Sequence, residues 1–522
     1  MRRLFKVAPA PTRGPILFWV PGGMPLMLHV EAVIAAALRL RGVEVHAVIC
    51  DGPFDACIKR EVTDGVPVER WHELCASCRK QTSSVLEDLD IPYSFVGDYV
   101  GAEDIEEFDR TARGVTWETL DELSYQGLQI GQNVRSAVIR YFQGAGFNGD
   151  ERIVKEYAQS GLTVASAAQN AMRRFKPDKV FMSHAIYVDW GPALQAAFAA
   201  GIPVVGWMAS YLTGRFYLRH LENGSSDFHS MSDSAWDAHA ARNPSETELA
   251  RLQKFTEDRY LKARSFDMKE FKSYRGDENE FRTRYRLDAE RPVWAVFCHI
   301  NWDQVADYSP MLHESFDEWV IHTVDTVSKH PEVQWLIKIH PAEKWDNPSS
   351  GTENLLSGRA LPPHVHIIPA DEDISPMDLY DVADGGVTVY GTPGLELSLM
   401  GKPAILAGEA HYGRRGFTYD ANTKREYEEL LARAGDIRPL SEERLGLAHR
   451  YGYSYFIERQ IPLPPVTDPS SRWWGIQTHR LKDLRPGSDP FVDLICDRIL
   501  DGRDFELTED LVLRAAEEEA HV

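Results

Sequence analysis

Apolar runs and helical periodicity alternate at the start of the chain. The run at 14–20 (GPILFWV) ends in the turn sequence at 21–23 (PGG), and apolar positions then recur at helical spacing over 29–41. Gly42 ends that pattern, and 43–49 (VEVHAVI) has the composition of a buried strand. A strand, a glycine turn, a helix and a second strand in this order predict a βαβ unit. The chain is therefore predicted to begin with an α/β domain built on a parallel sheet.

The same pattern recurs further along. A strand at 179–183, a helix at 193–200 and a strand at 202–207 extend the first domain, and a polar, charged stretch at about 224–288 is expected to hold a boundary. Beyond it we expect strands at 292–298, 333–339, 364–368, 386–389 and 403–406, with helices at 316–330, 377–382 and 395–400. These elements predict a second doubly wound sheet. The predicted fold class is therefore α/β, with two Rossmann-like doubly wound domains.

The expected division follows from these patterns. Residues 1–280 form the first domain, 281–450 the second, and 451–522 a tail that packs back across both. In doubly wound folds ligands bind at the carboxyl ends of the strands, so we expect the two domains to face a ligand cleft. The aromatic, proline-rich stretch at 451–474 is either part of this packed tail or an interfacial patch near a membrane.

The net charge and the lengths of the apolar segments exclude some classes of function. The 522 residues carry a net charge of −22, which argues against nucleic acid as a partner. No apolar segment approaches the ~18 residues of a membrane helix, and no signal-peptide pattern is visible, so we expect a cytoplasmic protein. Arg2, Arg3, Lys6 and Arg13 run against the acidic trend. They form either a solvated tail or a basic arm that meets an anionic membrane surface.

The segment VTVYGTPGLELSLMGKPAILAG at 387–408 has the richest chemistry. A strand enters a loop with Tyr390, Gly391, Thr392 and Gly394, and a helix that carries Glu396 follows at once. Glycines allow close approach of a ligand, the helix start offers N–H groups to phosphate, and Glu396 could accept hydrogen bonds from a ribose. The alternative is a plain strand-to-helix turn capped by threonine.

A second loop follows the strand expected at 333–339. Lys338 and His340 lie where that strand ends, and Pro341 prevents its continuation. A histidine at this position can donate to a phosphate or stabilise a leaving group. Because parallel strands end at one edge of a sheet, we expect Lys338 and His340 to lie beside the glycine loop.

These segments together resemble a known family. FCHINWDQ, LIKIHPAE, the 390–408 loop and helix, and HYGRRGFTYD are similar to bacterial capsule and surface-polysaccharide biosynthesis glycosyltransferases, over about 293–431. The resemblance implies a GT-B-like architecture, with the nucleotide-sugar donor in the C-terminal domain and the acceptor in the N-terminal domain. It further implies that His340 and Thr392 contact the donor phosphate and that Glu396 contacts the ribose. Relatives often have a Ser/Thr pair where this chain has Thr392-Pro393.

The implied activity is transfer of a sugar from a nucleotide sugar to a growing surface glycan of the capsule or lipopolysaccharide type. The acceptor would then be a glycan or a lipid-linked glycan. For this reason the protein could also bind peripherally at the inner face of the cell membrane. Three alternatives stay open: a sugar-nucleotide epimerase, a polyol-phosphate transferase of similar fold, and a non-catalytic subunit that binds nucleotide or glycan.

Further candidates for donor contacts lie in two loops. Asn301, Trp302 and Asp303 follow the first strand of the second domain, where an indole can stack on a base or sugar and the polar groups can bind hydroxyls. The alternative is a capped loop with a core tryptophan. Arg414 could meet anionic groups of the donor, or pair with the acidic surface.

A transferase that inverts configuration needs a base for the acceptor hydroxyl. The sequence SHAIYVDWG offers His184 and Asp189 at a strand end of the first domain. Asp189 could instead cap the helix that follows. The glycine turn at 21–23 is a second candidate for the acceptor side.

Four of the six cysteines lie within 29 residues, at Cys50, Cys57, Cys75 and Cys78. The Cys75-x2-Cys78 pair has the spacing of a zinc knuckle, and this cluster predicts a structural Zn²⁺ site that pins the 50–78 loop. An iron–sulfur cluster and unliganded thiols are the alternatives. Four thiolate ligands leave no open coordination position, so such a site would be structural.

Overall fold

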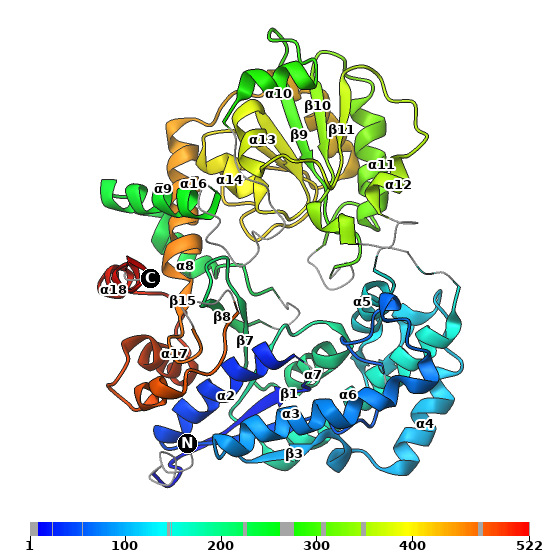
Figure 1. Cartoon of the computed structure of the whole chain (residues 1–522), viewed down its shortest axis with the longest axis vertical. Coiled ribbons are helices and arrows are strands. Elements are labelled where there is room, and N and C mark those ends of the chain that lie inside the picture. The colour runs from blue at the N-terminus through cyan, green and yellow to red at the C-terminus, as the bar shows by residue number, and fades with distance from the viewer. Residues whose placement is uncertain are drawn as a thin grey trace. The chain divides into compact units, whose positions relative to one another are not determined.

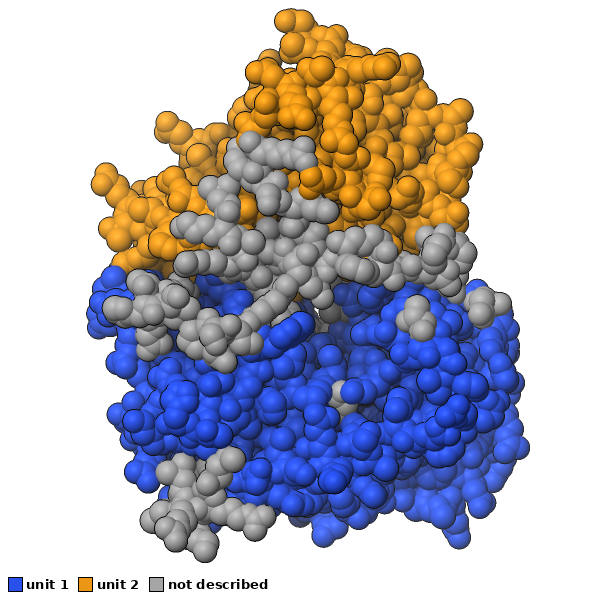
Figure 2. Space-filling model, viewed as in Figure 1, with its two compact units in different colours: residues 1–228, 302–308, 459–522 blue, residues 229–301, 309–458 orange. Residues whose placement is uncertain are grey.

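The computed structural model describes residues 9–22, 24–54, 56–143, 147, 149–222, 227–260, 276–303, 310–345, 351–467 and 473–520. Arg2, Arg3 and Lys6 of the basic segment and Gly23 of the glycine turn lie outside these ranges. The chain divides into two compact units (Figure 2). Unit 1 comprises residues 1–228, 302–308 and 459–522, and unit 2 comprises 229–301 and 309–458.

Unit 1 is built on a seven-stranded sheet with the order β15-β8-β7-β6-β1-β2-β3. Its strands are β1 (Arg13–Val20), β2 (Val43–Ile49), β3 (Tyr93–Phe95), β6 (Lys179–Ser183), β7 (Val204–Ala209), β8 (Arg215–Leu221) and β15 (Ile461–Pro462). The pairs from β3 through β7 are parallel, whereas β8 and β15 each add in antiparallel orientation. In sheet order the parallel strands run third, second, first, fourth and fifth, which is the Rossmann arrangement.

Unit 1 also contains α-helices, some of which pack on this sheet (Figure 1). They are α2 (Pro25–Leu40), α3 (Cys75–Asp88), α4 (Ala102–Ala112), α5 (Gly131–Phe142), α6 (Glu151–Phe175), α7 (Tyr187–Ala199), α17 (Pro490–Asp501) and α18 (Glu509–Ala520); a short hairpin pairs β4 (Ser124–Tyr125) with β5 (Leu128–Gln129). The last five residues of β1 are all buried, as expected for a parallel strand covered on both faces. Close helix packing depends on glycine: a Cβ on Gly191 of α7 would lie 2.3 Å from Asn133 of α5.

Unit 2 has a six-stranded parallel sheet with the order β11-β10-β9-β12-β13-β14. Its strands are β9 (Val293–Phe297), β10 (Gln334–Lys338), β11 (Val365–Ile368), β12 (Gly385–Thr388), β13 (Ala404–Leu406) and β14 (Tyr419–Asp420). If the strands of unit 2 are numbered by their place in the chain, their order across the sheet is third, second, first, fourth, fifth and sixth. Both units therefore have Rossmann-like strand order, and the predicted α/β fold of two doubly wound domains is confirmed.

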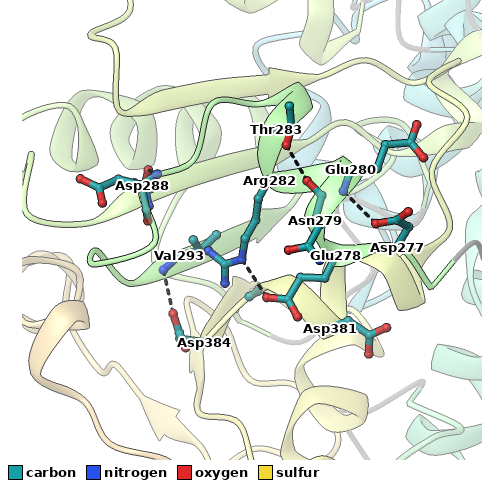
Figure 3. A network of polar contacts seen from close by, with 12 residues as sticks. Asp277, Glu278, Asn279, Glu280, Arg282, Thr283, Asp288, Val293, Asp381 and Asp384 are labelled. Carbon is teal, nitrogen blue, oxygen red and sulfur yellow. Dashed lines mark hydrogen bonds and ion pairs between the residues drawn. The ribbon is translucent and has the colours of Figure 1, made fainter.

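The helices of unit 2 are α8 (Asp233–Ala240), α9 (Glu246–Tyr260), α10 (Glu278–Arg284), α11 (Phe316–Val327), α12 (Thr352–Leu356), α13 (Pro376–Val382), α14 (Pro393–Leu399), α15 (Lys424–Ala432) and α16 (Glu442–Tyr453). Polar contacts fix the amino end of the sheet: Asp384 accepts a hydrogen bond from the Val293 amide at 2.8 Å (Figure 3). Lys402 donates to three carbonyl oxygens at the end of α13, those of Tyr380, Asp381 and Ala383. These contacts supply partners for groups that a strand or helix end leaves unpaired.

The division of the chain differs from the expected one at three places, and one of them is the segment 302–308, which was expected in the second domain but belongs to unit 1. Residues 229–280, expected in the first domain, belong to unit 2, because α9 packs on α16. Of the tail expected at 451–522, residues 451–458 belong to unit 2 and 459–522 belong to unit 1, where β15 extends the sheet beside β8. Among the described residues, no helix is long and apolar enough to cross a membrane.

Candidate active site

A pocket with a volume of about 880 Å³ opens in unit 2 at the carboxyl ends of β9, β10 and β12. The chain proceeds from β9 toward β11 on one side and from β12 toward β14 on the other, so the strand order reverses between β9 and β12. Ligands of doubly wound sheets bind at this switch point. Among the residues that line the pocket are five of the predicted donor contacts, namely Lys338, His340, Gly391, Thr392 and Glu396.

Lys338 is the last residue of β10, and only 8% of it is exposed. Its ammonium group donates a hydrogen bond to the carbonyl oxygen of Pro369 at 2.7 Å. Burial lowers the pKa of Lys338 to about 8, and acidic neighbours such as Glu372 oppose this shift. Near neutral pH the pocket therefore holds a cation that has lost most of its water, and such a cation is well suited to attract phosphate.

His340 lies two residues beyond Lys338, where Pro341 turns the chain into a short helical segment. The backbone amide of Ala342 donates to Nδ1 of His340 at 3.1 Å. A neutral ring in this position carries its proton on Nε2. His340 lines the pocket beside Thr392, so its ring can donate a hydrogen bond to an oxyanion or pass a proton to a leaving group.

His299, which follows β9, is a pocket residue that the sequence analysis missed. Its Nε2 accepts hydrogen bonds from the amides of Val389 at 3.3 Å and Tyr390 at 3.1 Å, so Nδ1 carries the proton. Burial, reinforced by the charge of His340, lowers the pKa of His299 to about 3. The ring stacks on Phe316 with its centroid 4.6 Å away. His299 thus holds the start of the glycine loop against the end of β9 through hydrogen bonds. Because of its low pKa, the ring stays neutral across the physiological pH range.

The glycine loop connects β12 to α14. Gly391 and Thr392 line the pocket, and the hydroxyl of Thr388 accepts a hydrogen bond from the Gly391 amide at 3.2 Å. Gly394 has a different role from the predicted one, because it is buried away from the pocket against Tyr412. A Cβ at Gly394 would lie 2.2 Å from the Tyr412 hydroxyl oxygen. We therefore attribute this glycine to packing rather than to ligand access.

Glu396 reaches the pocket from α14, but its carboxylate already has protein partners. The Tyr380 hydroxyl donates to Oε2 at 2.5 Å, and Nε of Arg259 lies 3.4 Å from Oε1. Both charged side chains are almost fully buried, at 7% and 2% exposure. Arg259 and Tyr380 also line the pocket and were not foreseen, because they come from α9 and α13 and no local motif marks them.

Besides Gly394, three predicted donor contacts of unit 2 lie outside the lining of this pocket. Tyr390 packs its ring against Phe316, and Arg414 forms a surface ion pair with Glu409 at 2.9 Å. Asn301 donates a hydrogen bond to Asp317 at 3.1 Å. Each of these side chains is therefore engaged in a local contact.

Trp302 and Asp303 belong to unit 1, although they follow Asn301 directly in the chain. The Tyr187 hydroxyl donates to Asp303 Oδ1 at 2.5 Å, and the guanidinium of Arg140 lies 5.6 Å from the Trp302 ring centroid. The structure therefore separates three residues that the sequence analysis grouped.

His184 lies in a strained loop at the carboxyl end of β6. His184, Ala185 and Tyr187 all have positive φ values, between 52° and 58°, in which non-glycine residues are uncommon. Such strain is concentrated at functional sites. The His184 ring stacks on Trp190, and burial lowers its pKa to about 4. His184 is therefore neutral near pH 7.

Asp189, the second candidate base, is 2% exposed in the first turn of α7. Its Oδ1 accepts a hydrogen bond from the Ile58 amide at 3.1 Å. Ile186, rather than Asp189, is the N-cap of α7. Burial raises the pKa of Asp189 to about 7, which is the range in which a general base works best at neutral pH.

The four clustered cysteines line one pocket of unit 1, together with Asp189. The structure does not support the predicted zinc site: among the described residues no three His, Cys, Asp or Glu side chains are placed to hold a metal ion. Burial raises the pKa of the Cys50 and Cys57 thiols, that of Cys57 to about 12. In the absence of a metal ion, both thiols are therefore protonated at neutral pH.

No protein-family model matches the chain, and no curated protein matches it. Similar solved structures include the β-Kdo 2,4 transferase of Thermosulfurimonas dismutans KpsC, at 13% identity over 59% of this chain and 87% of that one, with a TM-score of 0.36. UDP-GlcNAc 2-epimerase from Neisseria meningitidis is 12% identical over 85% and 96% of the two chains, with a TM-score of 0.27. The glycosyltransferase SnogD from Streptomyces nogalater is 14% identical over 86% and 96%, with a TM-score of 0.25. The solved structures that resemble this chain thus include glycosyltransferases and a sugar-nucleotide epimerase.

Proposed function

We propose that the chain is a glycosyltransferase that binds a nucleotide-sugar donor in the pocket of unit 2. One observation carries this proposal: Lys338, His340 and His299 come from two strand ends and line a single pocket at the switch point of the sheet. Cationic and N–H donor groups gathered there suit the phosphate of a nucleotide. The resemblance of the 293–431 segment to capsule and surface-polysaccharide transferases supports a surface glycan as the product.

The chemistry of transfer assigns a role to each group. As the bond between the sugar and the phosphate breaks, negative charge grows on the departing nucleotide. Lys338 and the Nε2 proton of His340 stabilise that charge, and the low polarity of their surroundings strengthens the effect. His299 keeps the loop that carries Gly391 and Thr392 at a fixed distance from β9.

Unit 1 contributes the acceptor side in this proposal. Asp189 takes the proton of the acceptor hydroxyl, because its pKa of about 7 makes it a suitable base near neutral pH. His184 has the lower pKa, about 4, and is therefore the weaker base of the two candidates.

The test is a panel of UDP-, CMP-, GDP- and dTDP-linked sugars scored by thermal stabilisation of the full chain. A ligand at 100 times its Kd stabilises the folded protein by about 2.7 kcal/mol, so a true donor gives a clear rise in Tm. Lys338→Met should abolish this rise. Arg425→Ala, which removes an exposed cation on α15, should retain it. If no nucleotide sugar of the panel raises the Tm of the parent protein or of Arg425→Ala, the donor assignment is refuted.

The need for an acceptor distinguishes a transferase from an epimerase. A transferase consumes the donor stoichiometrically with an added glycan acceptor, whereas an epimerase interconverts the donor with none present. Following the donor by NMR with and without acceptor distinguishes them. Interconversion of the donor without an acceptor would show that the protein is an epimerase. Binding of the donor without any turnover would show that it is a non-catalytic subunit.

A further inference from the structure

The cysteine-lined pocket of unit 1 is a second chemical site that the proposed transfer reaction does not explain. It lies at the carboxyl ends of β1 and β2, where Pro21, Gly22, Cys50 and Gly52 contribute to its wall. Four thiols line it. All six cysteines of the chain are described, and none forms a disulfide. A cluster of partly exposed thiols in one pocket is a site for thiol chemistry.

Cys75 and Cys78 are the pair whose spacing permits a bond. They are the first and fourth residues of α3, and residues three apart share one face of a helix. Helix geometry places their Cα atoms about 5 Å apart, which lies within the range found in disulfides.

Two glycines leave room for these thiols. The Cys75 Sγ lies 3.5 Å from where a Cβ on Gly52 would be, and the Cys78 Sγ lies 3.6 Å from where a Cβ on Gly22 would be. Both glycines have φ near +90°, a conformation that side-chain-bearing residues rarely adopt. A side chain at either glycine would therefore contact one of the two thiols of α3.

The other two thiols are less suited to attack. Burial raises the pKa of Cys50 and Cys57, and the thiolate is the reactive form of cysteine. Cys50 is also engaged, because its sulfur accepts a hydrogen bond from the Gly52 amide at 3.3 Å. Lys59, the buried Arg60 and Asp189 also line this pocket, so it holds both basic and acidic side chains.

We propose that Cys75 and Cys78 form a dithiol–disulfide exchange site for low-molecular-weight disulfides. The Cys75 thiolate attacks one sulfur of the disulfide, the sulfur–sulfur bond breaks, and one thiolate leaves and takes up the proton that Cys75 released. The Cys78 thiolate then attacks the Cys75 sulfur and displaces the second thiolate, which takes up the proton from Cys78. The protein loses two electrons and two protons, and the small disulfide is reduced to two thiols.

The new bond would form in the pocket that also holds Asp189, the proposed acceptor base. Oxidation is therefore expected to slow glycosyl transfer. That consequence rests on the proposed function, whereas the exchange reaction does not. A protein that exchanges thiols but transfers no sugar would leave the present inference intact.

The experiment equilibrates the full chain in buffers of varied reduced-to-oxidised glutathione ratio, blocks the remaining thiols by alkylation after denaturation, and maps peptides by mass spectrometry. We expect one reversible disulfide, Cys75–Cys78, with the other four cysteines alkylated throughout. Cys78→Ser should instead trap glutathione on Cys75. Cys57→Ser, a change in the same pocket, should leave the Cys75–Cys78 bond able to form.

Three results would overturn the proposal. One is a disulfide that joins a different pair, such as Cys50–Cys75. Another is a set of thiols that all remain reduced at every glutathione ratio. The third is a stoichiometric metal ion in protein purified without a metal-affinity step, together with four cysteines that resist alkylation in the native chain until a chelator is added. Because the mapping uses the unmodified chain, the outcome does not depend on whether a variant folds.

Discussion

Each unit has a pocket at the carboxyl ends of its parallel strands, and the first five parallel strands of the two sheets have the same order, but the chemistry of the two pockets differs. In unit 2 the strand ends carry Lys338, His340 and His299, which present N–H groups and positive charge. In unit 1 the strand ends carry glycines and thiols, with one buried carboxylate, Asp189. The strand order determines where each pocket forms, and a few side chains at the strand ends determine what each can bind or react with.

The largest effect is expected from removing the histidine that distinguishes unit 2. His340→Ala should lower the rate of sugar transfer about 10²–10³-fold, as loss of one preorganised donor to a developing oxyanion does. The fold should survive, since His340 lies in a loop at the pocket. Rapid-quench measurement with the donor found in the panel gives the rate. An unchanged rate would show that His340 has no role in transfer and that it does not distinguish the pocket of unit 2 functionally from that of unit 1.

The packing of Gly394 behind the pocket of unit 2 offers a second test. Gly394→Ala should destabilise unit 2 by ~1–3 kcal/mol, because the new Cβ would crowd the Tyr412 hydroxyl. Tyr412→Phe should recover part of this loss in the double variant. Gly446→Ala on α16, where the nearest atom to a Cβ would be 3.7 Å away, is the matched control and should not destabilise. Thermal denaturation of the four variants measures the coupling, and additive losses would contradict the packing role.

Buried acids also differ between the units. Glu396 of unit 2 faces Arg259, whereas Glu31 of unit 1 is held by the Ser183 amide and the Trp207 indole, and burial raises its pKa to about 8. An unfolded glutamate ionises near pH 4.3, so folding above that value requires Glu31 to take up a proton. The contribution of Glu31 to stability is therefore full below about pH 4.3 and is lost as the pH rises toward 8.

Glu31→Gln stays neutral and keeps an oxygen for both hydrogen bonds. We expect it to be more stable than the parent at pH 8 by ~2 kcal/mol, with a smaller margin at pH 5. Glu44→Gln on the exposed face of β2 should show no such dependence. Denaturation at the two pH values is the measurement, and a margin that does not grow with pH would mean that Glu31 is ionised in the fold.

The smallest expected effect concerns the pH dependence of donor binding. Because the pKa of Lys338 is about 8, its charge is present below that pH and is lost above it. The Kd of a nucleotide should rise about tenfold per pH unit once Lys338 deprotonates, while Lys338→Arg should bind with a flat profile. Calorimetric titrations between pH 7 and 9.5 test this. Parallel curves for the two proteins would show that the cation of Lys338 does not contact the ligand.

The fold was largely predictable from the chain, and the reasons are local. Buried parallel strands such as β1 and β9 are continuous apolar runs, and glycine turns mark their ends, so periodicity locates them. The antiparallel strands β8 and β15 were not foreseen, and β15 comprises only two residues, one of which pairs with Phe216, 245 positions earlier. Local patterns carry no information on such pairings.

The same distinction applies to the site. Lys338 and His340 were found because they end a recognisable strand next to a proline. His299 was overlooked in the FCHINWD segment in favour of the polar residues after it, and its role depends on amides 90 and 91 positions away. The cysteines show the opposite error: their spacing suggests a metal, but the positions of their thiols do not fit one.

The composition of unit 1 from separate segments has a consequence for biosynthesis. The ribosome completes β8 about 240 residues before it reaches β15, and the entire sheet of unit 2 is made in the interval. During that time the backbone groups of β8 that later pair with Ile461 and Pro462 remain open at the edge of the sheet. Open strand edges are templates for pairing with other chains. The nascent protein thus passes through a stage at which its first sheet is exposed to self-association, and release from this stage coincides with synthesis of the last tenth or so of the chain.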